Sequence, residues 1–551
     1  MIKLKKDWEA HIDGSFVTRD AYQSLSDKEK DDGFIDNLAF GTAGIRGKFG
    51  LGPNRLNKYT VQKVARGIGE YLNTQHDSPR VVIGYDTRHF SPEFMRTISE
   101  VLSALKINVV VTPEYTSTPE LSYYVRKYES DLGIMITASH NPPEYNGIKV
   151  YGPDGSQLID APSKTISEYI NNVENIFSID TLDFEAAVKE DRVKYVSDAV
   201  KKSYRDEVLD FVGPIPESSL KIVFTSLHGT SVPIVPELLD ALNFKQYTLV
   251  DAQCVPDGDF PTVASPNPES PEAFEHAIDT GNAVGADLLI ATDPDADRMG
   301  VVVKHDESYV HLSGNQIGIL LLNRAVQNVD AQVKPVAVKS IVTSDLGTKI
   351  IEDAGGEMIN VLTGFKYIGE TILNMEDDIT RQFVIGYEES YGYLLKPFVR
   401  DKDAIQVVPY IVKYAAELKN ENRTLIDELT ALYEKFGHRQ EHLWSHTFDG
   451  AEGRAKIDKI MHDFRENTPL QINGRKVIAI EDFSIQKHHD VVNDSYETIE
   501  LPEANVIKLH FEDGWIALRS SGTEAKIKLY ISIDTDNLIE EAEAINDLVF
   551  G

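Results

Sequence analysis

The sequence has a single cysteine, Cys254, in 551 residues. One thiol cannot form an internal disulfide, and it cannot build a metal site from clustered cysteines. We interpret Cys254 as a small packed residue. This cysteine usage is typical of a protein of the reducing cytoplasm.

Long apolar runs are also missing. No stretch of about 18 apolar residues occurs, which is the minimum for a membrane-spanning helix. Residues 1–14 lack the apolar core of a signal peptide. We therefore expect a cytoplasmic protein with no membrane partner.

Positive charge is scarce. The chain has 55 Lys and Arg residues against 88 Asp and Glu, a formal net charge of −33. Nucleic acids and anionic membranes need a positive surface, so we expect neither as a partner. A small anionic substrate would need basic residues gathered locally, against the overall negative field.

Strand-like apolar runs alternate with amphipathic helical segments up to about residue 430, which predicts α/β layers with largely parallel sheets. A weak threefold repetition follows the same pattern: a buried strand with a polar loop, then a second strand with an unusual loop. The pairs are 79–88 with 133–142, 220–230 with 288–298, and 334–345 with 383–392. From about residue 440 the chain becomes strand-rich, which predicts a smaller α+β domain with an antiparallel sheet.

The loop after the strand at 133–136 carries Ser139 and His140. Ligands of open α/β sheets bind beyond the carboxyl ends of the strands, so Ser139 is a candidate nucleophile. A polar turn that caps a following helix is the alternative. The glycines of an esterase elbow are absent here. Nearby, Lys149 follows an Asn-Gly turn and either moves protons or neutralises phosphate, or is simply solvated.

The second unusual loop has three aspartates at alternate positions, Asp293, Asp295 and Asp297. Three carboxylates can converge on one hard cation, and their mutual repulsion disfavours the cluster without one. An EF-hand calcium loop is excluded, because Arg298 occupies its glycine position and Lys304 its final ligand position.

Three further loops are candidates for substrate contacts. Glu388 and Ser390 follow the third repeated strand and can hold sugar hydroxyls, or form a solvated loop. Arg519 begins a Ser/Gly-rich turn between two strands, which suits either a phosphate or an ordinary hairpin. The glycine-rich segment 41–47, with Arg46 inside it, is a less distinctive loop of the same kind.

Taken together, these segments resemble the α-D-phosphohexomutase superfamily over about residues 40–530. The carrying motifs occur in order: FGTAGIRG, GYDTR, TASHNPPEYNGIKVY, DPDADR, GYEESYG and RSSGTEAK. The resemblance implies four domains around a central cleft, three related α/β domains with mixed, largely parallel sheets and a C-terminal α+β domain with an antiparallel sheet. The expected ranges are 1–205 with a phosphoserine loop, 206–322 with a metal loop, 323–435 with a sugar-binding loop, and 436–551 with a phosphate-binding loop.

The same resemblance implies roles for individual residues. Ser139 would carry a phosphoryl group and, with Asp293, Asp295 and Asp297, would hold one Mg²⁺ per chain. Arg46, His140 and Lys149 would complete the catalytic set, with Lys149 the first candidate to move protons and His140 the second. The expected substrate-binding residues are Arg298, Thr363, Gly364, Glu388, Ser390, Lys402, Arg519, Ser521, Gly522 and Thr523.

The implied activity is that of an isomerase: reversible phosphoryl transfer between glucose 1-phosphate and glucose 6-phosphate. It would run through a phosphoserine and glucose 1,6-bisphosphate, which also acts as activator. Tyr387, Tyr391 and Phe365-Lys366 depart from the commonest family motifs. They look more like the long phosphoglucomutases of Gram-positive bacteria and the animal phosphoglucomutase-2 branch.

Other readings of the sequence stay open. Mannose, pentose and amino-sugar phosphates are alternative substrates within the resemblance. A metal-dependent phosphosugar phosphatase is the rival enzyme class, with water as acceptor. A non-enzymatic sugar-phosphate sensor would not need Ser139, the three aspartates and Lys149 together. Whether the protein is a monomer or a dimer cannot be inferred from the sequence.

Overall fold

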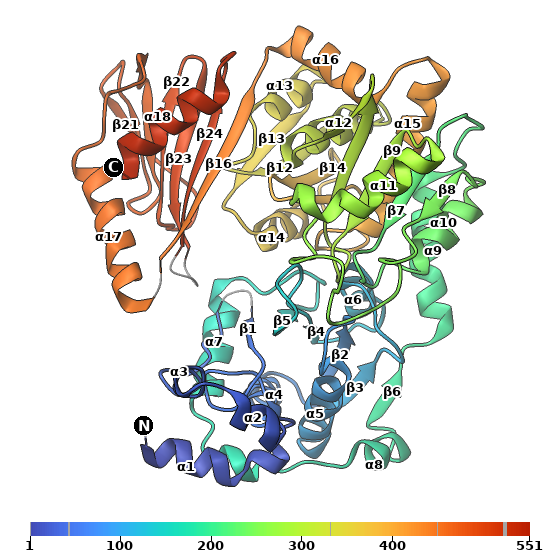
Figure 1. Ribbon diagram of the computed structural model, residues 1–551, viewed down its shortest axis with the longest axis vertical. Coiled ribbons are helices and arrows are strands. Elements are labelled where there is room, and N and C mark those ends of the chain that lie inside the picture. The colour runs from blue at the N-terminus through green and yellow to red at the C-terminus, as the bar shows by residue number, and fades with distance from the viewer. Residues whose placement is uncertain (1, 42–43, 331, 449, 522–525, 551) are drawn as a thin grey trace. The chain divides into compact units, whose positions relative to one another are not determined.

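The computed structural model describes residues 2–41, 44–330, 332–448, 450–521 and 526–550. The chain divides into two compact units. The first comprises residues 1–337 and 365–426, and the second comprises residues 338–364 and 427–551. Figure 1 labels many of the helices and strands of both units.

A short helical segment at the N-terminus precedes the first sheet of the first unit. Trp8 anchors it: this side chain is 1% exposed and makes edge contacts with Phe34, Tyr59 and Phe177. The segment therefore packs as part of the first α/β layer rather than as a free tail. Its elements are α1 (Ile2–Ala10), η1 (Ile12–Gly14), α2 (Arg19–Ser24) and α3 (Asp27–Asp32).

The first sheet has the order β1-β5-β4-β2-β3-β6. Strand β2 pairs in parallel with β3 and β4, while β5 and β1 add antiparallel strands at one edge. The central strand β4 is buried along its whole length, as expected of a strand covered on both faces. The strands are β1 (Ile45–Lys48), β2 (Arg80–Tyr85), β3 (Asn108–Val111), β4 (Leu132–Ile136), β5 (Tyr145–Tyr151) and β6 (Val193–Tyr195).

Amphipathic helices cover this sheet, and the core lies between them and the strands. Helix α6 begins with a capping box between Ser117 and Glu120, which fixes where its first turn starts. The helices are α4 (Lys58–Gln75), α5 (Ser91–Ala104), α6 (Thr118–Lys127), α7 (Asp160–Asn171), η2 (Ile176–Ser178), α8 (Phe184–Lys189) and α9 (Asp198–Val212).

The second sheet repeats this plan in the order β11-β10-β9-β7-β8. Strand β7 pairs in parallel with β8 and β9, and β10 returns antiparallel beside β9. The strands are β7 (Ile222–Thr225), β8 (Tyr247–Leu249), β9 (Leu288–Thr292), β10 (Met299–His305) and β11 (Ser308–His311). The helices are α10 (Ile234–Ala241), η3 (Pro271–Phe274), α11 (Glu275–Val284) and α12 (Gly314–Val326).

Residues 365–426 return to the first unit with a third α/β segment. Strands β14 (Arg381–Glu388) and β15 (Gly392–Leu394) form an antiparallel pair, and α12 packs on β14. Helices α14 (Phe365–Met375) and α15 (Ala404–Asn420) flank the pair in sequence.

The second unit is dominated by an antiparallel sheet in the order β16-β24-β23-β22-β19-β20-β21. Helices α17 (Gly450–Glu466) and α18 (Leu538–Phe550) pack against β23, β24 and β16, and against each other, which places both on one face (Figure 1). The strands of this sheet are β16 (Gln440–Thr447), β19 (Ala479–Asp482), β20 (Lys487–Asp490), β21 (Ser495–Thr498), β22 (Val506–Phe511), β23 (Gly514–Ser520) and β24 (Lys526–Ile533).

The remaining elements complete the second unit. They are β12 (Lys334–Ser340), which enters it from the first unit, α13 (Leu346–Asp353), β13 (Glu357–Val361), α16 (Leu425–Phe436), α17 (Gly450–Glu466), β17 (Gln471–Ile472), β18 (Arg475–Lys476) and α18 (Leu538–Phe550). Mixed sheets in the α/β part and an antiparallel C-terminal sheet confirm the expected fold class. The shared central cleft and the four domain boundaries stay predictions.

One feature of the topology positions the candidate site. The three unusual loops each join a strand to an antiparallel neighbour: β4 to β5, β9 to β10, and β14 to β15. Each loop is therefore a hairpin connection at the carboxyl end of its first strand. The threefold repetition in the sequence corresponds to this repeated strand–hairpin unit.

Candidate active site

Ser139 lies in the hairpin loop between β4 and β5. Its side chain is buried, and its backbone adopts a left-handed conformation with φ of 51°. The Ser139 N–H donates to Thr137 Oγ1 over 2.8 Å, which holds the loop in this tight shape. The chain continues into β5 at Tyr145 rather than into a helix, so the capping interpretation of Ser139 is wrong.

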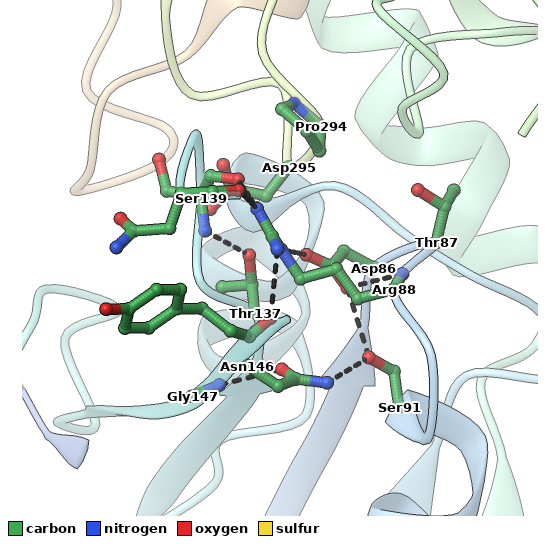
Figure 2. A network of polar contacts seen from close by, with 12 residues as sticks. Asp86, Thr87, Arg88, Ser91, Thr137, Ser139, Asn146, Gly147, Pro294 and Asp295 are labelled. Atoms are coloured by element: carbon green, nitrogen blue, oxygen red, sulfur yellow. Dashed lines mark hydrogen bonds and ion pairs between the residues drawn. The ribbon is translucent and has the colours of Figure 1, made fainter. Parts of the chain in front are cut away.

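A buried arginine at the end of β2 hydrogen-bonds to the backbone of this loop. Arg88 follows β2 and is 2% exposed, and its guanidinium donates to the backbone carbonyl of Ser139 over 2.6 Å and to that of Asn141. It also donates to the carbonyls of Pro142 and Tyr145, each over 2.9 Å. Figure 2 shows the Arg88 side chain extending from the end of β2 toward the serine loop.

The charge of Arg88 is matched by Asp86, whose Oδ2 lies 3.4 Å from Arg88 Nε. Asp86 Oδ1 accepts hydrogen bonds from the Arg88 N–H and the Ser91 hydroxyl, as Figure 2 shows. The sequence analysis noted the GYDTR motif but did not select Arg88 as a site residue. Its contacts join two strand ends that are about 50 residues apart, and no local pattern could have shown them.

The three aspartates meet in the hairpin between β9 and β10. Asp293, Asp295 and Asp297 are 0%, 0% and 2% exposed, and each offers a carboxylate oxygen within 4.8 Å of the others. Asp293 Oδ1 accepts the N–H groups of Asp297 and Arg298, at 3.1 and 2.9 Å, which closes the loop on itself. This local turn brings the three alternately spaced carboxylates together.

The donor set fits a divalent metal ion. Among the described residues, Asp295 Oδ1 and Asp297 Oδ1 are buried without a hydrogen-bond partner, a costly arrangement that a cation would relieve. Ser139 Oγ lies 2.7 Å from Asp293 Oδ2, so the serine shares this site. Burial and the charges of Asp295 and Asp297 raise the pKa of Asp293 well above its ordinary value, as expected of carboxylates held close together.

Two buried lysines flank the aspartates. Lys149 Nζ lies 2.7 Å from Asp295 Oδ2 and 3.1 Å from Asp297 Oδ2, and Lys402 Nζ lies 3.2 Å from Asp297 Oδ2. Burial would lower the pKa of Lys149, but the carboxylates of Asp295, Asp297 and Asp401 outweigh it and raise that pKa. Lys149 is 6% exposed, so the alternative of a solvated lysine is wrong.

Other candidate residues of the first unit border the same loops. His140 Nδ1 lies 3.2 Å from Ser139 Oγ, and Arg46 on β1 donates to Asn141 Oδ1 over 2.8 Å. Arg298 Nε lies 3.8 Å from Asp297 Oδ1. Burial and the positive charges of Arg298 and Arg46 lower the pKa of His140 well below its ordinary value.

The candidate sugar loop is tied directly to the metal loop. Glu388 ends β14 and is buried, and Ser390 lies in the following turn. The Met299 N–H donates to the Tyr391 carbonyl over 3.1 Å, and Arg298 forms a β-bridge with Gly392. Gly392 must lack a side chain, because a Cβ there would lie 2.2 Å from Lys402 Cδ. The expected solvated loop is thus an ordered neighbour of the aspartates.

Thr118, at the first position of α6, is a site residue that the sequence analysis missed. Its hydroxyl donates to Asp295 Oδ2 over 2.8 Å, and its N–H donates to the Asp295 carbonyl over 2.8 Å. The Ser117 and Glu120 capping box was a readable signal that a helix begins here. The contact between this helix start and the metal loop, 177 residues away, could not be predicted from the sequence.

Six of the expected substrate residues belong to the second unit. Arg519 ends on β23 and Ser521 follows it, with the Ser521 N–H donating to the Lys526 carbonyl over 2.8 Å across the hairpin. Gly522 and Thr523 lie outside the described residues. Thr363 and Gly364 follow β13, and Gly364 has a φ of 126°. The phosphate-binding role of these residues stays a prediction.

Four family models match the chain in succession. They describe phosphoglucomutase/phosphomannomutase α/β/α domains I, II and III and the C-terminal domain, at residues 37–177, 197–307, 313–436 and 471–547. A phosphoglucomutase of Staphylococcus epidermidis is 49% identical over 549 residues, covering 100% of both chains. The chain belongs to the phosphoglucomutase/phosphomannomutase family.

Another relative agrees with the assignment, and a solved structure shares the fold. A phosphoglucomutase of Staphylococcus aureus is 46% identical over 551 residues, covering 99% of this chain and 98% of its own. The solved structure of parafusin, a phosphoglucomutase from Paramecium, shares the fold with a TM-score of 0.68 at 19% identity, covering 94% of each chain. Among the helices of the described residues, none has the length and apolarity needed to cross a membrane.

Proposed function

We propose that the protein is a phosphoglucomutase, an isomerase that interconverts glucose 1-phosphate and glucose 6-phosphate. The observation that carries the proposal is the placement of Ser139 Oγ, buried and 2.7 Å from Asp293 in a carboxylate cluster fit for a metal. Relatives named phosphoglucomutase, 46–49% identical over essentially the full chain, support glucose as the sugar.

One Mg²⁺ per chain would be held by Asp293, Asp295, Asp297 and an oxygen on Ser139. Carboxylate oxygens are its preferred protein ligands, and three of them leave positions open for phosphate oxygens. When bound, the ion neutralises negative charge that builds up on the transferred phosphoryl group. The partnerless oxygens of Asp295 and Asp297 support this assignment.

Ser139 carries the phosphoryl group between two half-reactions. In the first, the serine Oγ–P bond breaks as a bond forms from phosphorus to the free hydroxyl oxygen of the sugar phosphate, giving glucose 1,6-bisphosphate. The hydroxyl proton leaves to a base of the site and is passed to Ser139 Oγ, so that the serine is left as a neutral hydroxyl; the return transfer runs the same proton movement in reverse. The bisphosphate turns end for end, and its other phosphoryl group returns to Ser139. Glucose 1,6-bisphosphate is therefore both intermediate and activator.

Charge and proton handling fall to different neighbours. Lys149 and Lys402 each engage a carboxylate through Nζ, so they act as cations that offset phosphate charge. His140 Nδ1 lies 3.2 Å from Ser139 Oγ, so its neutral imidazole can relay a proton to and from the serine, although its lowered pKa keeps it from retaining that proton. On this geometry His140 precedes Lys149 as the proton-transfer candidate, the reverse of the sequence-based order.

The substrate needs contacts beyond the metal. Glu388 and Ser390 hold sugar hydroxyls, because their loop is anchored beside Arg298 at the metal loop. Arg46 and Arg298 border the transferred phosphate. Arg519, Ser521, Gly522 and Thr523, with Thr363 and Gly364, hold the phosphate that is not transferred. Such local clusters let a chain of net charge −33 bind an anion. The substrate is the only partner proposed, and the setting is the cytoplasm.

A panel of sugar 1-phosphates tests the proposal. Glucose, mannose, ribose and N-acetylglucosamine 1-phosphates are assayed for isomerisation with Mg²⁺ and trace glucose 1,6-bisphosphate. We expect the highest kcat/KM for glucose, a rate that depends on the bisphosphate, and no stoichiometric inorganic phosphate. Release of one phosphate per sugar would instead establish the phosphatase reading, and a preference for another sugar would reassign the substrate.

The nucleophile is tested separately. Ser139→Ala should form no phosphoenzyme with labelled glucose 1,6-bisphosphate and should lose mutase activity, while keeping the melting temperature of the wild type. Ser24→Ala, which removes an exposed hydroxyl at the end of α2, is the matched control and should label normally. Near-normal turnover of Ser139→Ala would overturn the assignment.

A further inference from the structure

A second pocket lies in the first unit, away from the aspartate cluster. It encloses about 730 Å³, within the range typical of small-molecule sites. Its walls are the last turn of α6, the end of α14, the start of β14 and the loop 396–400. The pocket residues of α6, from Tyr123 to Lys127, lie about 7 to 13 Å along the helix axis from Thr118, which contacts the metal loop.

The charge of this pocket is opposite to that of the chain. Five basic side chains line it against three acidic ones: Arg126, Lys127, Arg381, Lys396 and Arg400 against Glu207, Glu376 and Asp378. Acidic residues outnumber basic ones 88 to 55 over the whole sequence. A local excess of positive charge in a strongly acidic protein attracts and retains small anions.

Arg126 and Arg400 share a single carboxylate, and each also donates through Nη1 to loop carbonyls, Arg126 to Pro397 and Phe398 and Arg400 to Pro397. One carboxylate, Glu376, serves two guanidinium groups: its Oε1 lies 3.2 Å from Arg126 Nη2 and 2.9 Å from Arg400 Nη2. Arg400 is 3% exposed, and its Nε is buried without a hydrogen-bond partner among the described residues. Burial and the charge of Arg126 lower the pKa of Arg400 to about 10.

The pocket also has an apolar side. Tyr123, Phe383 and Phe398 contribute rings, and Tyr123 and Phe398 meet edge to face with centroids 6.2 Å apart. Ile379 at the pocket is 89% exposed, an apolar side chain left open to water. Aromatic and aliphatic surface beside guanidinium groups suits a ligand with a flat ring and a phosphate.

We propose that this pocket binds a small phosphorylated molecule with an aromatic ring, of the chemistry of a nucleoside phosphate, at a site separate from the active site. The phosphate is held by Arg126 and Arg381, the buried Arg400 adds its charge from the pocket wall, and the ring lies against Phe398. None of the residues that line the pocket belongs to the Ser139 site. The proposal therefore stands independently of the sugar specificity of the enzyme.

Binding of ADP to the full-length protein, followed by isothermal titration calorimetry, tests this site. The buffer contains EDTA, so that no metal can bridge the nucleotide to the aspartates, and saturating glucose 6-phosphate, which occupies the active site. We expect one ADP per chain under these conditions. Absence of binding, or its loss when glucose 6-phosphate is added, would overturn the proposal.

Two variants with opposite expected effects on ADP affinity make the test specific. Arg381→Gln should weaken ADP binding roughly tenfold or more, as expected for the loss of a charge-assisted hydrogen bond. Glu376→Gln removes the carboxylate shared by Arg126 and Arg400 and should tighten ADP binding. Lys194→Gln, an exposed lysine of β6 outside the pocket, should change nothing. Unfolding of each variant is followed in parallel to confirm that it folds.

Equal ADP affinity in wild type and Arg381→Gln would place the nucleotide elsewhere and overturn the proposal, as would weaker binding to Glu376→Gln. Inorganic phosphate and citrate serve as comparison probes. ADP binding tighter than phosphate supports a ring contact. Equal or tighter binding of citrate would show a general anion site and contradict the nucleoside-phosphate assignment.

Discussion

Arg88 donates to the backbone carbonyl of Ser139 over 2.6 Å, so a side chain from the end of β2 holds the loop at the end of β4. Four carbonyls of that loop share the same guanidinium. A planar fork with five donors can satisfy them together, which a lysine ammonium cannot. Arg88 is therefore a positioning residue for the nucleophile rather than a catalytic one.

Arg88→Lys tests this role. Misplacing a reacting group by about 1 Å can cost roughly 100-fold in rate, so kcat should fall by about that factor while KM changes little. Arg80→Lys, on the exposed end of β2, is the matched control and should leave both parameters unchanged. A rise in KM with an unchanged kcat would show that Arg88 supports substrate binding instead.

Removal of one aspartate tests the metal site. Mg²⁺ that binds only the folded protein stabilises it by about 2.7 kcal/mol at 100 times Kd, which should raise the melting temperature of the wild type. Asp293→Asn should lose most of this Mg²⁺-dependent increase and most of the mutase activity. Asp259→Asn, an exposed acidic residue, should retain both. An undiminished Mg²⁺ effect in Asp293→Asn would place the ion elsewhere.

Arg519 tests the proposed phosphate loop. Arg519→Ala should raise KM for glucose 1-phosphate roughly 10- to 100-fold, the range expected when a charged hydrogen bond is lost, with a smaller change in kcat. The control is Arg475→Ala, an arginine of the same unit whose partners are Asp513 and Glu541. Unchanged substrate affinity in Arg519→Ala would remove the loop from the substrate site.

Glu441 predicts a pH dependence of stability in the second unit. Burial raises the pKa of Glu441 to about 7, outweighing its hydrogen bonds with Ser344 and Ser532. A carboxyl group whose pKa is higher in the folded state favours folding below its unfolded pKa, near 4.5, and loses that contribution as the pH rises through about 7. The wild type should therefore lose stability between pH 5 and pH 8.

Glu441→Gln is the variant that checks this expectation, since an amide cannot ionise. The melting temperatures of wild type and variant are compared from pH 5 to pH 8. The gap between them should move in favour of the variant as the pH rises. A constant gap would show that Glu441 does not titrate in this range.

Much of the chemistry could be inferred from the sequence alone. The alternate spacing of Asp293, Asp295 and Asp297 predicted a cluster because a short loop must turn those side chains together, and the loop's own backbone closes the turn. Apolar strand-like runs that alternate with amphipathic helical segments predicted the α/β layers, because hydrophobic periodicity is a local property of the sequence. The ordered motifs then pointed to the family.

Relationships between distant segments were decided only by the tertiary structure. Three contacts join elements that are far apart in the chain. Arg88 donates to the Ser139 carbonyl, Thr118 donates to Asp295, and Glu376 pairs with both Arg126 and Arg400. From the sequence, Lys149 could be a solvated lysine or a proton carrier. The structure shows it buried between the carboxylates of Asp295 and Asp297. Sequence determines which groups are available, whereas burial and packing across strand ends determine which charges meet, because those depend on the three-dimensional path of the whole chain.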